Sequence, residues 1–486
     1  MRKSLKLNAV LNMLRSSLSL IFPFITFPYV SRVLGSNEFG KYSFSASVIS
    51  YFSLFAAYGI STYAIREAAP IRENKEKISQ LASKLFSFNI YTSILAYIVI
   101  FLLTATNSRF EPYRPLIMIQ SISILLTTVG MDWINTVYED FLYITVRFII
   151  IQFVSLFAIF IFVRSPSDTL QYCLILVMAS YGGNLVNIIY VRKYVKIKFH
   201  LNPKMLHCII PLTMIFINSL AVTIYVNSDV VMLGLLQGSY QVGIYSFSSK
   251  IYNIAKHCIY ALVVAAIPRL AYLKVNDGAQ YLNYLNKITS ALALVLIPCS
   301  FALFLLAKSI IIVVGGPEYL QGVLSLRILS IALIFALISS VYTNCILIIN
   351  KLEKYVLIST LTAAFVNVAA NFIIIPVYSA AGAAITTVIA EGINLIIQRL
   401  FISKKMDLKI KINTNNVVCI LGGAIITVLI CLLANHLFRG DEIRISIIRI
   451  IFSVIITISS YLMLLISLKN DFALGVIKEL KYRFQK

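Results

Sequence analysis

Apolar residues form long runs, about twenty residues each, that recur along nearly the whole chain. An α-helix rises about 1.5 Å per residue, so a run of this length crosses the ~30 Å hydrocarbon core of a bilayer. The runs cover residues 10–30, 42–63, 85–104, 115–135, 146–163, 169–191, 208–227, 241–267, 288–306, 323–347, 356–375, 381–402, 417–437 and 446–468. This pattern predicts an all-α polytopic membrane protein with about 14 transmembrane helices.

A six-residue phrase occurs twice in the chain. The phrase Gly40–Ser45 (GKYSFS) returns 203 residues later as Gly243–Ser248 (GIYSFS), and at the same offset Arg66 is matched by Arg269. Repeats of this length in an apolar chain predict two fused, pseudo-symmetric six-helix bundles. We therefore expect a first bundle at 1–192, a cytoplasmic basic linker at 193–207, a second bundle at 208–403, and two extra transmembrane helices with a cytoplasmic tail at 404–486.

Lysine and arginine are distributed unevenly between the two sides of the predicted membrane. With the N-terminus inside, 29 of the 42 cations fall on the inner side and 8 on the outer side. Because Lys and Arg are retained in cytoplasmic loops, this bias predicts that both termini are cytoplasmic. The net charge of +23 then faces anionic inner-leaflet lipids, and no nucleic-acid partner is expected.

Composition narrows the classes of function further. Hydrophobic residues make up 59% of the 486 positions and charged residues 13%, which excludes a soluble protein. The seven cysteines include no Cys-x-x-Cys pair and the four histidines lack ligand spacing, so we expect no metal, cofactor or disulfide. The loops are short, which disfavours a membrane polysaccharide polymerase or glycosyltransferase, and no catalytic residue is predicted.

Polar residues inside the predicted helices recur every three or four positions and therefore share a helix face. These stripes consist of Asn8, Asn12, Arg15 and Ser19; Ser43, Ser47 and Ser50; Ser180, Asn184 and Asn187; Lys250, Asn253 and His257; Asn367 and Asn371; and Thr387, Glu391, Asn394 and Gln398. Two interpretations stay open. The stripes either face a hydrated cavity, because lipid disfavours polar groups, or they hydrogen-bond neighbouring helices.

Charged residues at mid-span are the strongest candidates for a function, because a Lys or Arg at the bilayer centre costs about 2.5–3.5 kcal/mol. Lys256 lies about ten residues from either end of its apolar run. Lys250 and Arg15 lie at intermediate depth, where a long side chain can also reach the interface. Glu391 is the one acid at mid-span, and it either pairs with a cation or carries a proton or ion.

The excess of positive charge at mid-span favours an anionic substrate, since Lys and Arg bind phosphate, and disfavours cationic drugs. We expect the substrate path to be lined by Asn12, Arg15, Lys250, Asn253, Lys256 and His257, with Arg66 and Arg269 at its inner mouth. For Arg327 and Arg449, near the outer ends of their helices, we expect the side chain to extend to the membrane interface.

Short motifs follow one another in a fixed order. They are Leu34-Gly35, Phe39-Gly40 and Tyr42; Ala64 with Arg66-Glu67; Asp132-Trp133; Glu139, Phe141, Tyr143-Ile144-Thr145 and Arg147; Tyr225, Asp229 and Met232-Leu233-Gly234; Val242-Gly243 and Tyr245; and Asn367, Asn371 and Ile375-Pro376. Together they resemble the Wzx-type flippases of bacterial O-antigen and capsule repeat units, in the multidrug, oligosaccharidyl-lipid and polysaccharide exporter (MOP) superfamily. The chain departs from that pattern at 134–137, where the family usually carries an aromatic residue, Gln or Asn, and Gly.

The resemblance implies a MATE-like flippase that moves an undecaprenyl-pyrophosphate-linked oligosaccharide across the bacterial inner membrane by alternating access through a cationic cavity. Its polyprenyl tail would stay among the inner-membrane lipids, and a polysaccharide polymerase and a chain-length regulator are candidate partners. Glu391 and Asp229 are the candidate ion-coupling residues. The alternatives on the same fold are a peptidoglycan-precursor flippase and a multidrug exporter.

Overall fold

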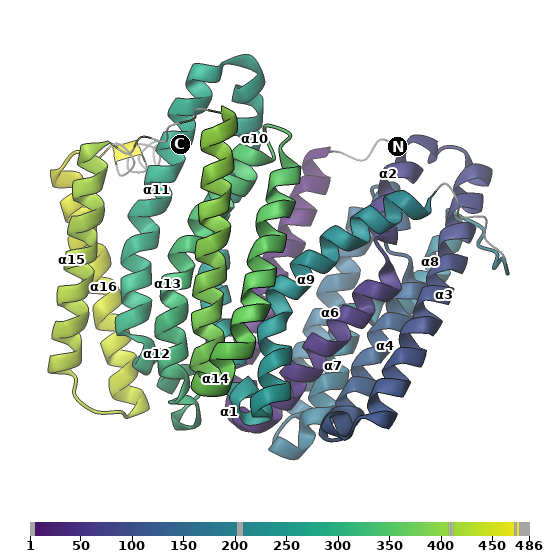
Figure 1. The fold of residues 1–486 in the computed structure, drawn as a ribbon, viewed down its shortest axis with the longest axis horizontal. Helices are drawn as coiled ribbons and strands as arrows, with labels where there is room; N and C mark the ends of the chain where they lie inside the picture. The colour runs from purple at the N-terminus through teal and green to yellow at the C-terminus, as the bar shows by residue number, and fades with distance from the viewer. Residues whose placement is uncertain are drawn as a thin grey trace. The chain divides into compact units, whose positions relative to one another are not determined.

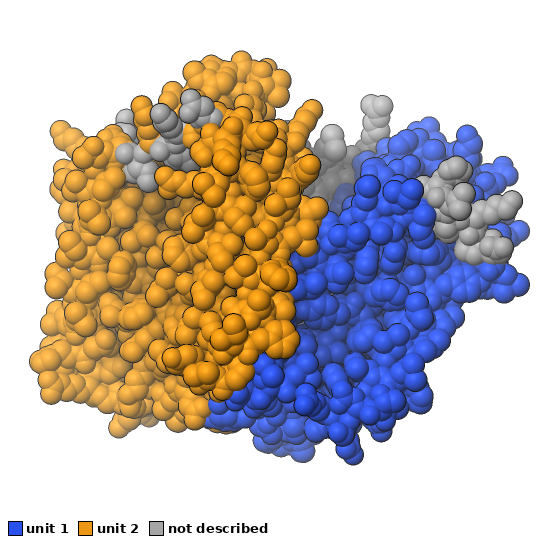
Figure 2. Space-filling model, in the orientation of Figure 1, with its two compact units in different colours: residues 1–243 blue, residues 244–486 orange. Residues whose placement is uncertain are grey.

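The computed structural model describes residues 5–201, 208–406, 408, 411, 413–470, 474 and 475 (Figure 1). Within these residues all regular structure is helical, as the apolar pattern predicts. By packing, the chain divides into two compact units, residues 1–243 (unit 1) and 244–486 (unit 2), which are blue and orange in Figure 2.

Unit 1 is organised around the long helix α1 (Leu5–Ala57), which packs against α3, α4, α6 and α9. The other α-helices of this unit are α2 (Ile60–Ala68), α3 (Lys75–Thr106), α4 (Arg114–Gly130), α5 (Trp133–Val137), α6 (Phe141–Phe162), α7 (Thr169–Tyr181), α8 (Gly183–Tyr190) and α9 (Ile209–Gln237). Short 3₁₀ segments join them at η1 (Ala69–Ile71), η2 (Ser108–Tyr113), η3 (Pro166–Asp168) and η4 (Val191–Lys193).

Unit 2 contains most of α10 (Ser239–Asn276) and the helices that follow it. These are α11 (Gly278–Leu305), α12 (Ala307–Val314), α13 (Gly322–Val341), α14 (Glu353–Met406), α15 (Thr414–Leu437) and α16 (Ile443–Ser467), with a 3₁₀ turn η5 (Pro317–Tyr319) and a π-helical stretch η6 (Tyr342–Leu347). Helix α13 packs along α14, and α11 contacts both α13 and α15. The last two helices, α15 and α16, are therefore attached through α11 and α12.

Eleven helices among the described residues are long and apolar enough to cross a membrane. Two of them contain a break, α1 at Gly35 (φ 72°, ψ 174°) and α14 at Ser379 (φ 49°, ψ −126°). With the two parts of each broken helix counted separately and the 17-residue α4 included, one helix corresponds to each of the 14 predicted runs. The predicted fold class is confirmed.

Both breaks fall between two predicted apolar runs, so the helical chain changes direction there without a long loop. Gly35 has a positive φ, a conformation that a residue with a Cβ adopts at a cost of about 1–2 kcal/mol. In α14 the break at Ser379 follows Pro376, whose ring removes a backbone donor from the helix.

Packing and sequence repetition divide the chain at different points. Helix α9 packs on α1 and α2 and therefore belongs to unit 1, whereas the repeat predicts that the second bundle begins at residue 208. A division by packing does not test descent by duplication, so the predicted bundles at 1–192 and 208–403 stay predictions. Of the predicted linker 193–207, residues 202–207 lie outside the described residues.

The two copies of the repeated phrase meet at their first glycines, within unit 1. A Cβ on Gly40 would lie 1.8 Å from the carbonyl oxygen of Ser239, and a Cβ on Gly243 would lie 1.8 Å from that of Ser36. No real Cβ approaches an oxygen this closely, so a side chain at either position would force the two backbones apart. Glycine is therefore required at both positions for this close approach.

The phenylalanine of the phrase packs against a tyrosine in both copies. Phe44 is fully buried in unit 1, and its ring centroid lies 4.3 Å from that of Tyr113. Phe247 is fully buried in unit 2 and stacks on Tyr319 at 4.1 Å. Equivalent aromatic pairs in the two units support the interpretation of the repeat as a duplication.

Candidate substrate-binding site

The predicted polar face of α10 is partly exposed. Lys250 and His257 are exposed, and Asn253 between them is partly exposed and donates to the Ser249 hydroxyl at 3.3 Å. These residues lie well inside a 38-residue helix of membrane-spanning character. Because lipid disfavours charged side chains within a membrane span, we expect this face to border water.

Lys256 and Glu391 form an ion pair within unit 2 that joins α10 to α14. The Lys256 Nζ atom lies 3.1 Å from Glu391 Oε1 and 5.5 Å from the centroid of the Tyr252 ring. The Glu391 side chain is 6% exposed and that of Lys256 is 30% exposed. The carboxylate is therefore buried while the ammonium group stays accessible, and we call this pair half-open. The sequence left two interpretations of Glu391. The structure shows the first, pairing with a cation, and the second, ion coupling, stays a prediction.

The polar residues that follow Glu391 on the same helix face bind α13 and its π-helical extension. Asn394 donates to the Ser339 hydroxyl at 3.1 Å, and the fully buried Gln398 donates to the Thr343 hydroxyl at 2.9 Å. For these two residues the interpretation as hydrogen bonds between helices holds. Glu391 differs from them because its partner is charged.

Asn12 and Arg15 lie near the beginning of α1, in unit 1. Asn12 is exposed, and Arg15 is partly exposed with its guanidinium carbon 5.7 Å from the centroid of the Phe148 ring on α6. Within the described part of the chain, Arg15 has no carboxylate partner. Its guanidinium is therefore available to an anionic ligand.

The remaining predicted residues occupy three different settings. Arg66 is exposed on α2 and pairs with Glu67 at 2.9 Å. Arg269 is exposed on α10, with its guanidinium 4.7 Å from the centroid of the Tyr284 ring. Asp229 is buried in α9. Their predicted parts at an inner mouth and in ion coupling stay predictions.

Unit 1 contains a cluster of charges and tyrosines that the sequence analysis did not single out. Asp140, which is 5% exposed, accepts hydrogen bonds from the hydroxyls of Tyr190 and Tyr194, both at 2.6 Å. Lys193 Nζ lies 3.1 Å from the same carboxylate. Burial, together with the nearby Asp140, raises the pKa of the Tyr194 hydroxyl. The spacing of Tyr190, Lys193 and Tyr194 along one helix face was the available signal.

Two motif residues make a second polar contact in unit 1. Arg147 Nη2 donates to both carboxylate oxygens of Asp132 at 2.6 and 2.8 Å, and Nη1 donates to the Gly183 carbonyl at 3.2 Å. These bonds join the beginnings of α5 and α8 to α6. The motif therefore has a structural role at the helix ends.

Arg449 extends toward the loop between α15 and α16, where protein groups bind it. The residue is 6% exposed, and its guanidinium donates to the Ser309 hydroxyl at 2.9 Å, to the Gly440 carbonyl at 2.9 Å and to the Phe438 carbonyl. Carbonyls at and after a helix C-terminus lack intrahelical partners, and this arginine satisfies them at the end of α15. The expected extension of Arg449 to the interface stays a prediction; what the sequence did not indicate is that protein carbonyls bind the guanidinium.

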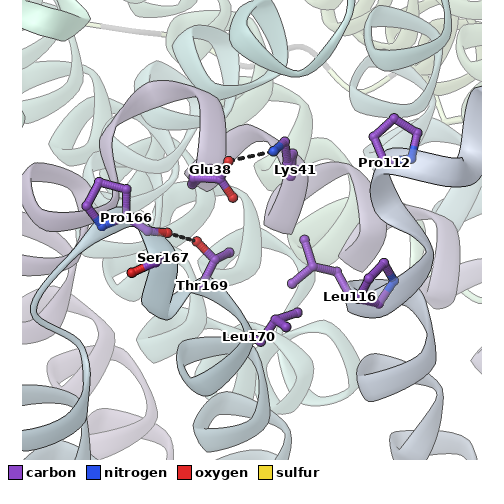
Figure 3. Close-up of a pocket in the computed structure, with 9 residues that line it drawn as sticks. Glu38, Lys41, Pro112, Leu116, Pro166, Ser167, Thr169 and Leu170 are labelled. Carbon is purple, nitrogen blue, oxygen red and sulfur yellow. Dashed lines mark hydrogen bonds and ion pairs between the residues drawn. The ribbon is translucent and has the colours of Figure 1, made fainter.

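A cavity of about 340 Å³ lies within unit 1 (Figure 3). Glu38 and Lys41 of α1, paired at 2.6 Å, form part of its wall together with Pro112, Pro166 and Leu116. It includes none of the predicted site residues, and its two charges neutralise each other. We therefore do not assign the substrate path to it.

The chemistry available at the predicted site is binding. The face of α10 offers ammonium, amide and imidazole groups beside a half-open ion pair, a set that suits phosphate oxygens. In the described ranges no three His, Cys, Asp or Glu side chains are placed to hold a metal ion.

Comparison with known proteins identifies the family. Residues 5–274, more than half of the chain, match the family described as "Polysaccharide biosynthesis protein". The chain belongs to this family. Over 415 residues it is 21% identical to the "Putative O-antigen transporter" of Escherichia coli (strain K12), covering 82% of this chain and 97% of that protein. The protein of the same name from Shigella dysenteriae is 21% identical over 392 residues, covering 80% and 97%.

Solved structures place the polysaccharide family member in a known fold. The lipid II flippase MurJ in an inward closed conformation is similar with a TM-score of 0.73 at 15% identity, covering 96% of this chain and 100% of that chain. An inward-facing multidrug resistance MATE family transporter of the MOP superfamily has a TM-score of 0.62 at 14% identity, covering 81% and 98%. The chain therefore has the fold of these multi-pass membrane transporters. The family match and the two relatives confirm the resemblance seen in the motifs. The proteins named here are transporters rather than enzymes.

Proposed function

We propose that this protein is a flippase that moves an undecaprenyl-pyrophosphate-linked oligosaccharide repeat unit across the bacterial inner membrane for surface polysaccharide synthesis. The family, the two O-antigen transporter relatives and the MOP fold support this function. The product would then pass to a polysaccharide polymerase and its chain-length regulator.

One observation carries the proposal: the partly exposed polar face of α10 beside the half-open Lys256–Glu391 pair. Lys250 and Lys256 would bind the pyrophosphate, because ammonium groups form charge-assisted hydrogen bonds to phosphate oxygens. On the same face, Asn253 would add a neutral hydrogen-bond donor, and His257 would add a donor whose charge depends on its protonation. No apolar drug would require this arrangement of donors.

On unit 1, Asn12 and Arg15 would provide a second polar surface for the same substrate. Arg66 and Arg269 would attract it at the cytoplasmic side, where anionic groups are drawn to exposed arginines. Asp229, buried in α9, would take part in ion coupling.

We also propose that both termini are cytoplasmic, which the distribution of 29 inner and 8 outer cations supports. A reporter fused after Lys486 should report the cytoplasm, and one fused after Asn107 the periplasm. A periplasmic signal from the Lys486 fusion would contradict the proposed orientation.

The function is tested by complementation. The gene should restore surface polysaccharide in a mutant of its own host that lacks it, and the mutant should accumulate the lipid-linked repeat unit on the cytoplasmic leaflet. Accumulation on the periplasmic leaflet would instead indicate a polymerase defect and would contradict the proposal.

A peptidoglycan-precursor flippase is the second candidate, because the fold likeness to the lipid II flippase MurJ extends over 96% of this chain. Expression in cells depleted of their lipid II flippase separates the two. Under the first proposal the cells still lyse, whereas survival at normal growth rate would favour the second candidate.

A further inference from the structure

An extended segment lies along the beginning of α3 in unit 1. Backbone N–H groups of alternate residues donate to serine hydroxyls of the helix: Lys196 to Ser79 at 3.1 Å, Lys198 to Ser83 at 3.0 Å and His200 to Ser87 at 2.8 Å. We call residues 195–201 the strap. At its end the Tyr91 hydroxyl donates to the Leu201 carbonyl at 2.5 Å.

The periods of strap and helix explain why this docking is regular. Two residues of extended chain advance about 6.6–6.8 Å, and four residues of α-helix advance about 6.0 Å, so every second strap residue meets every fourth helix residue. Each serine also donates to its own helix, Ser83 to the Ser79 carbonyl at 2.7 Å and Ser87 to the Ser83 carbonyl at 2.8 Å. Each hydroxyl thus both donates and accepts, and the strap is held along its length.

Alternation then divides the strap into two faces. Val195 is buried in the core of unit 1 and Ile197 packs against it, while Lys196 and Lys198 are exposed on the opposite face. The sequence predicted a basic linker at 193–207; its residues 195–201 lie along α3, with Lys196 and Lys198 exposed.

The depth of the strap follows from the rise of α3. The apolar run of this helix begins at residue 85, so Ser83 lies about 3 Å and Ser79 about 9 Å outside the hydrocarbon edge. The headgroup layer is about 5–7 Å thick on each side. The backbone of Lys198, bonded at Ser83, therefore lies at the level of the lipid headgroups. The backbone of Lys196, bonded at Ser79, lies about 2–4 Å farther out, a distance that a lysine side chain spans.

The strap also lies on the lipid-facing side of α3. The helix face that carries Ser83, Ser87 and Tyr91 continues toward the membrane centre into Ile94 and Ile98, which are 51% and 49% exposed. Exposed apolar side chains on a membrane helix face lipid.

The far end of the strap has the composition of a membrane interface. Phe199 is 47% exposed with its ring centroid 5.9 Å from that of Tyr91, and Leu201 is 85% exposed. A basic face followed by exposed apolar and aromatic residues is typical of interfacial segments.

We propose that the strap is a binding surface for anionic phospholipid headgroups of the membrane. Lys196 and Lys198 pair with lipid phosphates, and Phe199 and Leu201 insert at the boundary of the hydrocarbon. An acidic soluble protein would match the lysines but would leave the two apolar side chains exposed at hydrocarbon level. The proposal holds whichever substrate the protein carries.

The test measures which lipid surrounds the strap. The chain has a single tryptophan, Trp133, which is 6% exposed, so a Phe199→Trp variant adds one reporter at the strap and the wild-type protein supplies the background signal. The full-length variant is reconstituted in phosphatidylcholine with increasing brominated phosphatidylglycerol, whose bromine quenches nearby indole. We expect phosphatidylglycerol to be several-fold enriched at the reporter over its bulk fraction.

Removal of the strap charge should abolish the enrichment. One lysine near an anionic surface contributes roughly five-fold in affinity at low salt, so Lys196→Gln with Lys198→Gln should return the local composition to nearly the bulk value. The matched control, Lys404→Gln with Lys405→Gln, removes the same charge from exposed lysines at the end of α14 and should leave it unchanged.

Two further arms separate the alternatives. Ser83→Ala with Ser87→Ala keeps both lysines but removes two acceptors of the strap, and it should also lower the enrichment. Inorganic phosphate at 20 mM should not displace the lipid from a surface that also holds its apolar part. No enrichment in the parent, an equal loss in the Lys404/Lys405 control, or full displacement by phosphate would each overturn the proposal.

Discussion

The two units place their ion pairs at different positions along the helices. In unit 1, Asp132 with Arg147 and Asp140 with Lys193 lie where helices begin or end. In unit 2, Lys256 and Glu391 meet well inside two membrane-length helices. Water, lipid headgroups and backbone carbonyls can stabilise charges at helix ends. A pair inside the bilayer carries a desolvation penalty, and apolar residues could pack the same helices together without that penalty. The difference directs the search for substrate contacts to unit 2 and assigns the pairs of unit 1 to holding helix ends together.

The largest effect is expected from Lys256→Ala. It leaves the Glu391 carboxylate, whose side chain is 6% exposed, without its cation. Loss of one partner of a fully buried pair costs about 3–5 kcal/mol, and partial exposure of the lysine lowers this to roughly 2 kcal/mol. We expect a lower thermal unfolding midpoint of the purified protein and loss of surface polysaccharide, while Lys256→Arg retains most of both.

The double variant Lys256→Gln with Glu391→Gln separates structure from transport. It removes both charges, so thermal stability should recover most of what Lys256→Ala loses. Surface polysaccharide should stay low, because the cation that binds substrate is still missing. Normal polymer from this variant at wild-type protein level would remove Lys256 from the substrate path.

Glu391→Gln alone tests ion coupling. The amide keeps a hydrogen-bond acceptor for Lys256 but cannot take up or release a proton, so a coupled transporter should lose the dependence of flipping on a pH gradient. Flipping is measured in proteoliposomes with and without the gradient, for wild type and variant. Identical gradient responses would exclude coupling through Glu391.

In unit 1, Arg147→Lys should have a moderate and purely structural effect. The lysine keeps the charge next to Asp132 but loses the planar donor set that also reaches the Gly183 carbonyl. We expect a loss of about 1 kcal/mol in the free energy of unfolding. Transport per folded molecule should be unchanged; a selective loss of transport would show that the helix ends of unit 1 also take part in function.

The smallest effect is expected from Arg72→Ala. Its pair with Glu139 at 2.6 Å has side chains that are 42% and 39% exposed. Exposed pairs contribute about 0.2–1 kcal/mol, and solvent screening places this one at the lower end. The unfolding midpoint should move by a similarly small amount in Lys308→Ala, which removes a more exposed pair in unit 2, with side chains 44% and 56% exposed.

The sequence predicted the helices well because a membrane span needs only length and apolarity. It did not predict that helices would run through the turns at Gly35 and Ser379, since a single residue with positive φ leaves no change in hydropathy. The pairing of Lys256 with Glu391 was one of two open interpretations, because residues 135 positions apart meet only through tertiary packing.

For other residues the sequence shows a regular spacing or a position near a helix end, but it does not show which groups they contact. Ser79, Ser83 and Ser87 recur every four residues, but their partner is the strap, an extended segment more than a hundred residues away. Arg449 lies near a helix end as expected, but which carbonyls it would satisfy depended on the path of the following loop.

Under the predicted duplication, the contact between Gly40 and Gly243 has a consequence for how the two copies diverge in sequence. After duplication, the two copies of most positions are free to diverge, because each meets different neighbours. Here each glycine lies against the backbone close to the other glycine. A larger residue in either copy would therefore clash with backbone atoms, which cannot move aside as a side chain can. Positions that stay identical in the two halves of such a sequence can therefore mark residues of the two halves that contact each other. An alignment of one half of the chain with the other then predicts such contacts.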